Sequence, residues 1–509
     1  RGYSHVFVSG PSDGAECSDF VQVAECEGAF QEVYSRAKTR ALVLAYANGG
    51  TPDAIRASVA DVTVLSDRPY HPITQVTPIA HVRNRTVVEP PQPAASPSTN
   101  AAAAAPAPSP ATAPIDIPRS EGSSLYPEVE ALVRSHETTR TTSDTEEAWL
   151  ATTVARARAA LQQFQLNSKV IGEARLTPNA LIVRFQGAAN MTVELVQRRR
   201  SEFLTTHGLD LIAIRGEPGV VALSIARPVR QVLHSLDIWK RWEMKATEGN
   251  HRLLVAVREE DSELLFVSPS EHAPHTLIAG MTGSGKSVLM QNIILSIACT
   301  NTVEQAKIVL IDPKLGVDYF AFEGLPHIDG GIIEDQSAAI AQLNALVTEM
   351  DRRYGVLKAN KCSNIFELNR KQIATERFPV LWVIHDEFAE WMMTDHYRDT
   401  VTTVVSRLGV KARAAGIFLV FAAQRPDSNV MPMQLRANLG NRLILRVDSE
   451  GTSEIALGGD KGAERLLGRG HMLAKLEGQP GLIYSQVPMI GNDDIRRVVD
   501  AIRRGPEPT

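Results

Sequence analysis

The chain has 509 residues, of which 22% are charged and 44% are hydrophobic, and it carries a formal net charge of −5 at pH 7. This length predicts several domains, and the apolar fraction excludes wholesale disorder and fibrous repeats. The net negative charge excludes a polybasic nucleic-acid-binding protein, so any surface that binds nucleic acid must be a local basic patch. No apolar run approaches the roughly 18 residues of a membrane helix, so we expect no membrane segment in this chain. The four cysteines form no CxxC pair and no metal spacing, which fits either a reducing compartment, here expected to be the cytoplasm, or buried apolar sites.

Residues 1–88 have the pattern of a small α/β domain of unknown role. Tyr3–Val8 and Asp61–Leu65 are typical of strands, and Phe30–Tyr46 is typical of a helix. We find no motif in this region that carries chemistry.

Residues 89–125 predict a disordered linker rich in proline and alanine. Nine prolines and ten alanines lie between Pro90 and Pro118. Such a segment cannot bury enough apolar surface to order itself, and its prolines favour extended backbone.

Residues 126–245 predict a second α/β domain. Glu146–Phe164 has the pattern of an amphipathic helix, and Leu195–Thr206 predicts another. The expected strands are Ala180–Phe185, Leu211–Ile214 and Val220–Ile225.

Residues 246–509 alternate short apolar runs with helical patterns. This alternation predicts an α/β core with a mostly parallel sheet and helices on both faces. The expected strands are Thr276–Ala279, Ile308–Ile311, Val380–Ile384, Ile417–Ala423 and Leu443–Leu445.

A phosphate-binding loop follows the first of these strands and fits the pattern GxxxxGK[ST]. Glycines let backbone N–H groups curl around a phosphate, and the helix that follows adds a favourable dipole. Lys286 can reach the β- and γ-phosphates of a nucleotide, and the Ser287 hydroxyl can bind Mg²⁺. The expected nucleotide-binding residues are Gly280, Met281, Thr282, Gly283, Ser284, Gly285, Lys286 and Ser287.

Two acidic residues follow the strand Val380–Ile384, about 100 residues after the phosphate loop. Asp386, at the carboxyl end of a parallel strand, can hold Mg²⁺. Glu387 can polarise the attacking water as a general base. A strand followed by two acids is weak evidence for a catalytic site when it stands alone. Its position after a phosphate loop makes this evidence stronger.

Other polar residues follow neighbouring strands. Gln424 is placed to contact a γ-phosphate, although a strand-end amide can instead bond to loop backbone. Asp312-Pro313-Lys314 lies at the sheet edge where ligands bind. For His385, a buried side chain bonded to a backbone group is a better interpretation than a catalytic role.

Taken together, these motifs resemble the motor of the FtsK/SpoIIIE family of DNA translocases, within the wider FtsK–HerA group of ring ATPases. The resemblance covers roughly residues 140–504, including the smaller α/β domain before the motor. Further matching segments are Leu325-Pro326-His327, Glu349–Tyr354, Asn364–Lys371, Lys411–Gly416, Arg436-Ala437-Asn438 and Leu466–Leu473.

The resemblance implies a RecA-like P-loop core that hydrolyses ATP with Mg²⁺. It also implies a homo-hexameric ring around double-stranded DNA, with an arginine from the neighbouring subunit completing each site. Arg413, Arg436 and Arg442 are candidates for that arginine. A local basic lining could hold DNA phosphates without reading sequence. Its candidate residues are Arg407, Lys411, Arg413, Arg436, Arg442, Arg446, Arg465 and Arg469.

Septum-anchored pumps of this family carry membrane helices near their start and often a winged-helix domain after the motor, and from this sequence we expect neither. We therefore expect a DNA-translocating ATPase used in another setting, such as chromosome or plasmid movement or a restriction or defence complex. The alternatives are an ATPase that drives protein secretion and a nucleotide-gated scaffold with little hydrolysis.

Overall fold

The computed structural model describes residues 3–6, 21–26, 29–32, 124–137, 144–166, 168–242, 244, 249–371, 377–426 and 431–506. The chain divides into two compact units, Arg1–Pro106 and Ala107–Thr509, and each is described by itself. The expected linker lies outside the described residues except for its last two positions, 124 and 125.

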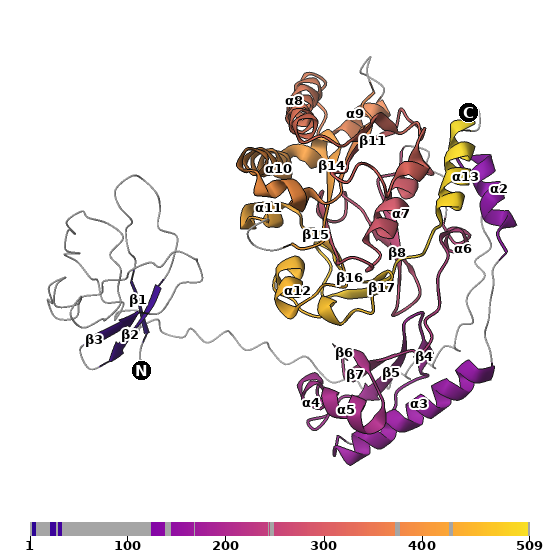
Figure 1. Ribbon diagram of the computed structural model, residues 1–509, viewed down its shortest axis with the longest axis vertical. Coiled ribbons are helices and arrows are strands. Elements are labelled where there is room, and N and C mark those ends of the chain that lie inside the picture. The colour runs from indigo at the N-terminus through magenta and orange to yellow at the C-terminus, as the bar shows by residue number, and fades with distance from the viewer. Residues whose placement is uncertain are drawn as a thin grey trace, which may run out of the picture. The chain divides into compact units, whose positions relative to one another are not determined.

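In the first unit, the described residues form a three-stranded antiparallel sheet (Figure 1). Its strands are β1 (Tyr3–Val6), β2 (Val21–Cys26) and β3 (Ala29–Glu32). The helix expected from Phe30 is wrong at its start, because β3 occupies those positions. Only two residues separate β2 from β3, and so short a connection favours antiparallel pairing. The rest of that expected helix and the strand at Asp61–Leu65 lie outside the described residues.

A ten-stranded sheet forms the centre of the second unit. Its order is β12-β11-β13-β14-β10-β15-β16-β17-β8-β9. The first six strands are parallel and the remaining pairs are antiparallel, which confirms a mostly parallel α/β core. The strands are β8 (Leu253–Arg258), β9 (Leu264–Val267), β10 (Thr276–Ala279), β11 (Ala306–Ile311), β12 (Ile328–Ile333), β13 (Val380–His385), β14 (Ile417–Ala423), β15 (Asn441–Leu445), β16 (His471–Lys475) and β17 (Ile483–Gln486).

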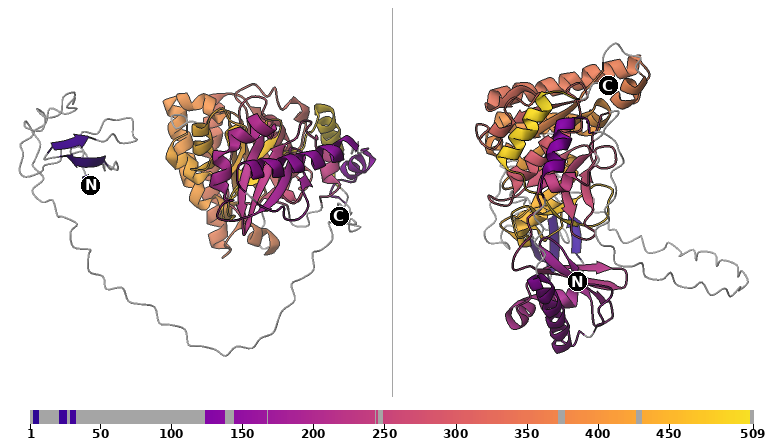
Figure 2. Two further views of the ribbon diagram at one scale, coloured as in Figure 1. Left: turned by 90° about the horizontal axis from the view of Figure 1, so that it is seen from below. Right: turned by 90° about the vertical axis from the view of Figure 1, so that its right-hand side faces the viewer.

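Both faces of this sheet are covered, because successive residues of its strands point to opposite sides. In β11, Ile308 and Leu310 face one core, whereas Val309 and Ile311 face the other. Helices α8 and α10 lie on one side of the sheet, and α7 and α13 lie on the other (Figures 1 and 2). The helices are α7 (Lys286–Ala298), α8 (Gln336–Ala359), α9 (Ile365–Lys371), α10 (Asp395–Ala415), α11 (Met433–Asn438), α12 (Glu450–Leu457) and α13 (Asn492–Arg503), with short 3-10 turns η1 (Phe320–Phe322), η2 (Phe388–Met393) and η3 (Ala463–Arg465).

A smaller antiparallel sheet, in the order β4-β5-β7-β6, precedes the large one in the chain. Helices α3 and α5 pack on it around a separate core that includes Leu161, Phe185 and Phe203. The helix expected at Leu195–Thr206 is interrupted at Arg199, which lies between α4 and α5. The elements are α3 (Asp144–Gln163), β4 (Arg175–Leu176), β5 (Ala180–Gln186), α4 (Val193–Arg198), α5 (Arg200–His207), β6 (Leu211–Glu217) and β7 (Val220–Ala226).

Both ends of the expected 126–245 domain pack into the core of the large sheet instead of the small one. Helix α2 (Pro127–Ser135) buries Val129 and Val133 there, and α6 (Ser235–Trp239) buries Trp239. The apolar side of the short amphipathic helix α2 packs against α13 and α6.

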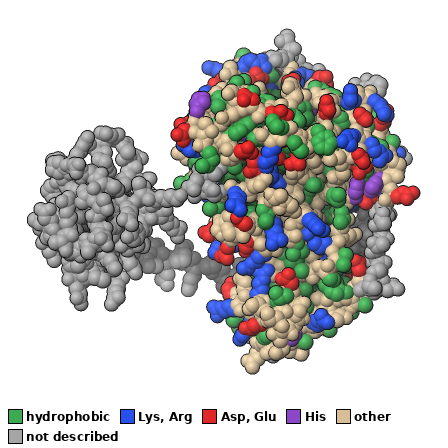
Figure 3. Space-filling model, in the orientation of Figure 1, with side chains coloured by type: hydrophobic (Ala, Val, Ile, Leu, Met, Phe, Trp, Pro, Cys, Tyr) green, Lys and Arg blue, Asp and Glu red, His purple; other side chains and the backbone are tan. Residues whose placement is uncertain are grey.

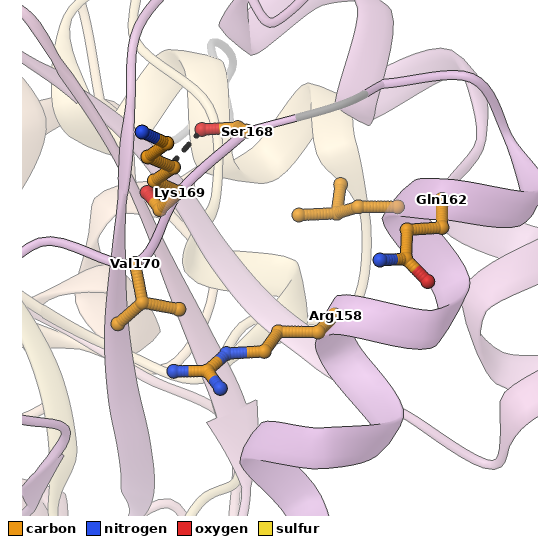
Figure 4. A pocket seen from close by; sticks show the side chains of 6 residues that line it. Arg158, Gln162, Ser168, Lys169 and Val170 are labelled. Atoms are coloured by element: carbon orange, nitrogen blue, oxygen red, sulfur yellow. Dashed lines mark hydrogen bonds between the residues drawn. The ribbon is translucent and has the colours of Figure 1, made fainter.

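The small sheet also borders a pocket of about 320 Å³ between α3 and the residues before β4 (Figure 4). None of its lining residues belongs to the phosphate loop. They are Arg158, Leu161, Gln162, Ser168, Lys169 and Val170.

Within the described parts of the chain, no helix combines the length and the apolar character needed to cross a membrane.

Candidate nucleotide and catalytic site

The phosphate loop (Gly280–Ser287) connects the end of β10 to the start of α7. Backbone geometry demands glycine at Gly285, where φ is +104°. A side chain there would also place its Cβ 2.6 Å from the main-chain nitrogen of Gly470. The loop therefore turns tightly into the N-terminus of a 13-residue helix, where backbone N–H groups favour an anion.

Lys286 and Asp386 form a buried ion pair at the head of this loop. Their side chains are 7% and 3% exposed, and the Lys286 ammonium donates to the Asp386 carboxylate. The Tyr319 hydroxyl donates to Oδ2 of Asp386 at 2.7 Å, and the Glu387 N–H donates to Oδ1 at 2.8 Å. Burial raises the pKa of Asp386, but the Lys286 charge and these hydrogen bonds outweigh it, so its pKa lies below the usual value.

Glu387 follows at the end of β13 in a left-handed conformation, with φ +40°. Its Oε2 lies 3.2 Å from Nζ of Lys314 and 3.6 Å from Nζ of Lys286. Its Oε1 accepts the Gln424 N–H at 3.0 Å. A strained backbone at a buried acid is typical of functional sites, because the surrounding contacts must hold it.

The aligned ends of the parallel strands explain why these residues meet. β13 pairs with β14 so that His385 lies opposite Phe421, and β14 pairs with β10 so that Ala423 lies opposite Ala279. Gln424 therefore reaches the phosphate loop, where the Thr282 hydroxyl donates to its Oε1 at 3.3 Å.

Two residues of this site were missed by reasoning from sequence. The Ser287 hydroxyl donates to Oδ2 of Asp318 at 2.9 Å, and Tyr319 contacts Asp386 as described above. Both lie in the segment after β11, next to the Asp312-Pro313-Lys314 motif. That motif's place at the sheet edge was the one sequence signal that could have extended the site to them.

A second loop backs the phosphate loop on its other side. The N–H groups of Arg469 and Gly470 donate to the carbonyls of Gly283 and Ser284, at 3.3 and 2.6 Å. The Gln486 side chain in turn donates to the Arg469 carbonyl at 2.9 Å.

This backing loop is bonded to residues that flank the small sheet. Arg230 donates to the Leu467 carbonyl at 3.3 Å and to Oε1 of Gln486 at 3.2 Å. Asn179 donates to the same Gln486 oxygen at 2.8 Å and to Oε1 of Glu259 at 2.6 Å. A continuous set of hydrogen bonds thus joins the small sheet to the phosphate loop.

Arg413 and Arg442, two of the arginines considered for the site of a neighbouring subunit, lie away from the phosphate loop of their own chain. Arg442 is at the beginning of β15, at the sheet edge opposite the phosphate loop, and donates to the carbonyls of Arg436 and Ala456. Arg413 donates to the carbonyl of His272, just before β10. Both guanidinium groups therefore satisfy main-chain acceptors within this chain.

The wider set of eight basic residues is distributed over several elements. Arg442 is the second residue of β15, Arg446 follows the last one, and Arg407 of α10 pairs with Asp351 of α8. On the face shown in Figure 3, lysine and arginine side chains are interspersed with acidic ones.

His385 is confirmed as a buried residue bonded to backbone. Its Nδ1 lies 2.8 Å from the Asp386 carbonyl, and its Nε2 contacts the Tyr397 hydroxyl. Burial lowers its pKa to about 4, so the ring is neutral at pH 7.

The residues present fit a nucleotide. Ser284 Oγ is buried and finds no hydrogen-bond partner among the described residues, which leaves a polar atom available in the loop. Lys286, Ser287 and Asp386 supply an ammonium, a hydroxyl and a carboxylate at one helix N-terminus. This donor set suits a triphosphate with a hard divalent cation.

Residues 239–428 match the FtsK/SpoIIIE family. A DNA translocase FtsK of Helicobacter pylori is 31% identical over 348 residues, which are 67% of this chain and 40% of that protein. A DNA translocase FtsK of Mycobacterium tuberculosis is 30% identical over 366 residues, 68% of this chain and 43% of that protein. The chain thus spans about two fifths of the length of these curated relatives. A solved structure of the pCW3 conjugation coupling protein TcpA aligns with a TM-score of 0.47 at 23% identity, covering 68% of this chain and 98% of that one.

Proposed function

We propose that this chain, which carries an ATPase motor domain of the FtsK/SpoIIIE family in residues 239–428, hydrolyses ATP and uses the energy to move along double-stranded DNA. The observation that carries the proposal is the convergence of Lys286, Asp386, Glu387 and Gln424 on one phosphate loop. Asp386 and Glu387 follow β13, Gln424 follows the neighbouring β14, and Lys286 begins the helix after β10.

Each residue has a distinct role in the proposed hydrolysis. The loop from Gly280 to Gly285 cradles the phosphates, and Lys286 exchanges Asp386 for the β- and γ-phosphates. Glu387 orients the attacking water as general base, and Gln424 contacts the γ-phosphate. These roles require the buried ammonium to leave its carboxylate partner when the triphosphate enters.

We assign Mg²⁺ to Ser287 and Asp386, with Asp318 close by. When bound, the ion would neutralise charge developing on the transferred phosphoryl group. Ser287 and Asp386 would hold it beside the phosphates, and Tyr319 would keep the Asp386 carboxylate oriented.

The proposed assembly is a homo-hexameric ring around the duplex, with the nucleotide between subunits. Arg413 and Arg442 lie at the sheet edge opposite the phosphate loop, so either could serve only the site of another copy. Head-to-tail contacts of this kind close into rings. Residues 126–245 would act as the accessory domain, 246–509 as the motor and 89–125 as a tether for the N-terminal domain 1–88.

We place such a motor in chromosome or plasmid movement, or in a restriction or defence complex. Protein secretion is the competing use of a motor of this kind. The two uses differ in whether duplex DNA engages the protein.

The deciding experiment measures steady-state ATP hydrolysis with and without linear duplex DNA, across a range of salt concentrations. We expect stimulation by DNA that weakens as salt rises, because phosphate contacts dominate such binding. Lys286→Met should abolish turnover, and Glu387→Gln should retain bound ATP without hydrolysis. Hydrolysis that survives both substitutions would place the active site elsewhere, and turnover that ignores DNA would favour secretion or scaffolding.

A further inference from the structure

The segment that leaves β11 folds back onto the catalytic residues. The Asp312 carboxylate accepts the N–H groups of Lys314 and Gly316, both at 3.0 Å, and fixes the turn. Leu315 and Gly316 both have left-handed backbone, with φ +60° and +66°. A side chain on Gly316 would bring its Cβ within 2.9 Å of Ile332. The turn is thus fixed by the Asp312 hydrogen bonds and packs closely against Ile332.

This turn directs Lys314 towards the proposed general base. Its Nζ lies 3.2 Å from Oε2 of Glu387, the same oxygen that lies 3.6 Å from Lys286. The other oxygen of Glu387 accepts the Gln424 N–H. Both carboxylate oxygens are therefore engaged, and one of them lies between two ammonium groups.

Of these two lysines, only Lys286 belongs to the phosphate loop. The proposed entry of ATP draws Lys286 to the phosphates, whereas Lys314 comes from the segment after β11 and stays beside Glu387. The Lys314 side chain is 41% exposed and that of Glu387 is 9% exposed, so the lysine can move outward while the acid remains enclosed. Partial burial lowers the pKa of Lys314, but the charge of Glu387 outweighs it, so its pKa is raised and the ammonium stays charged.

We propose that Lys314 is a positioning residue that holds the Glu387 carboxylate in a resting arrangement and so restrains ATP hydrolysis until the site is engaged by DNA. This inference rests on the proposed function, because it assumes that Glu387 serves as the base. Once ATP has drawn Lys286 away, Lys314 and the Gln424 N–H still hold one oxygen each, which restrains the carboxylate and makes it a weaker base towards water. Release of Lys314 frees one oxygen for that water, and the DNA-bound state of the ring would supply the release.

The test compares Lys314→Met, Lys314→Arg and the wild type. Methionine keeps the length of the side chain without its charge, and arginine keeps the charge. Lys307→Met is the matched control, because Lys307 lies at the other end of β11 and pairs with Asp329 at 2.9 Å. The pair lies partly in solvent, so its removal should leave the fold intact, which circular dichroism would verify.

The readouts are kcat and KM for ATP, each with and without duplex DNA. Lys314→Met should raise kcat without DNA by about two- to fivefold, the range expected when a partly exposed ion pair is released. KM should stay within about twofold, because the lysine does not hold the phosphates in the resting state. Stimulation by DNA should fall by the same factor, and Lys314→Arg and Lys307→Met should behave like the wild type.

Three outcomes would overturn the inference. An unchanged kcat in Lys314→Met would show that the contact restrains nothing. A lower kcat or a higher KM would show that Lys314 binds the phosphates directly. Equal changes in Lys307→Met would show a general effect of charge. A wild type without any ATP hydrolysis would instead refute the proposed function itself, so the two failures are distinguishable.

Discussion

Replacing Lys286 with methionine should destabilise the protein through its partner, Asp386. Both side chains are almost fully buried, so solvent screens their attraction little. Removing one partner of a buried ion pair costs about 3–5 kcal/mol, because the remaining charge is left uncompensated. The Tyr319 hydroxyl and the Glu387 N–H still donate to Asp386, which favours the lower half of this range.

The loss in Lys286→Met should depend on pH with a defined sign. In the wild type the folded-state pKa of Asp386 is lowered, so the pair stabilises the fold above the unfolded pKa of about 4 and loses this contribution as pH falls through the lower folded value. In the variant, burial prevails and the folded-state pKa of Asp386 rises. The deficit should therefore be largest at neutral pH and should shrink as pH falls through that raised pKa.

The assay is urea unfolding at pH 7 and pH 5, combined with hydrogen exchange of the β13 amides. The matched control is the double variant Lys286→Met/Asp386→Asn, which removes both charges and should recover more than half of the lost stability. The reasoning is refuted when Lys286→Met matches the wild type at pH 7, or when the double variant is as unstable as the single one.

Three further substitutions test other parts of the site and core. Gly285→Ala should weaken binding of a fluorescent ATP analogue by about tenfold or more, because φ is +104° at this position and the added Cβ would crowd Gly470. Unchanged affinity would contradict the need for glycine. Arg353→Met should cost about 3 kcal/mol in urea unfolding, because this buried guanidinium donates to two main-chain carbonyls and to an acid; a cost under about 1 kcal/mol would count against that role. Arg230→Ala should raise the KM for ATP several-fold without unfolding the protein, because the loop behind the phosphate loop loses the donor to its Leu467 carbonyl. Unaltered kinetics would show that this hydrogen bond is not needed.

The sequence predicted those parts of the site whose residues lie close together in the chain. A phosphate loop needs its glycines, lysine and serine within eight residues, so the pattern locates it without a structure. Asp386 and Glu387 were predictable because parallel strands bring their carboxyl ends to one edge, and the structure places both beside the loop.

Long-range partners were not predictable in the same way. Asp318 and Tyr319 meet Ser287 and Asp386 only because the chain turns back after β11, and no short spacing encodes that turn. Helix α2 has an amphipathic pattern that does not reveal which of two cores it covers. The antiparallel strands β16, β17, β8 and β9 extend the sheet in an order that periodicity alone cannot supply.

The hydrogen bonds behind the phosphate loop decide how this protein can be divided for experiments. A fragment that starts at residue 249 would keep the whole loop and every side chain that we propose to be catalytic. It would nevertheless strip Gln486 and the Leu467 carbonyl of two donors, Asn179 and Arg230. In this fragment the loop behind the phosphate loop would be held by fewer hydrogen bonds. We therefore expect nucleotide affinities measured on the fragment to be lower than those of the intact chain.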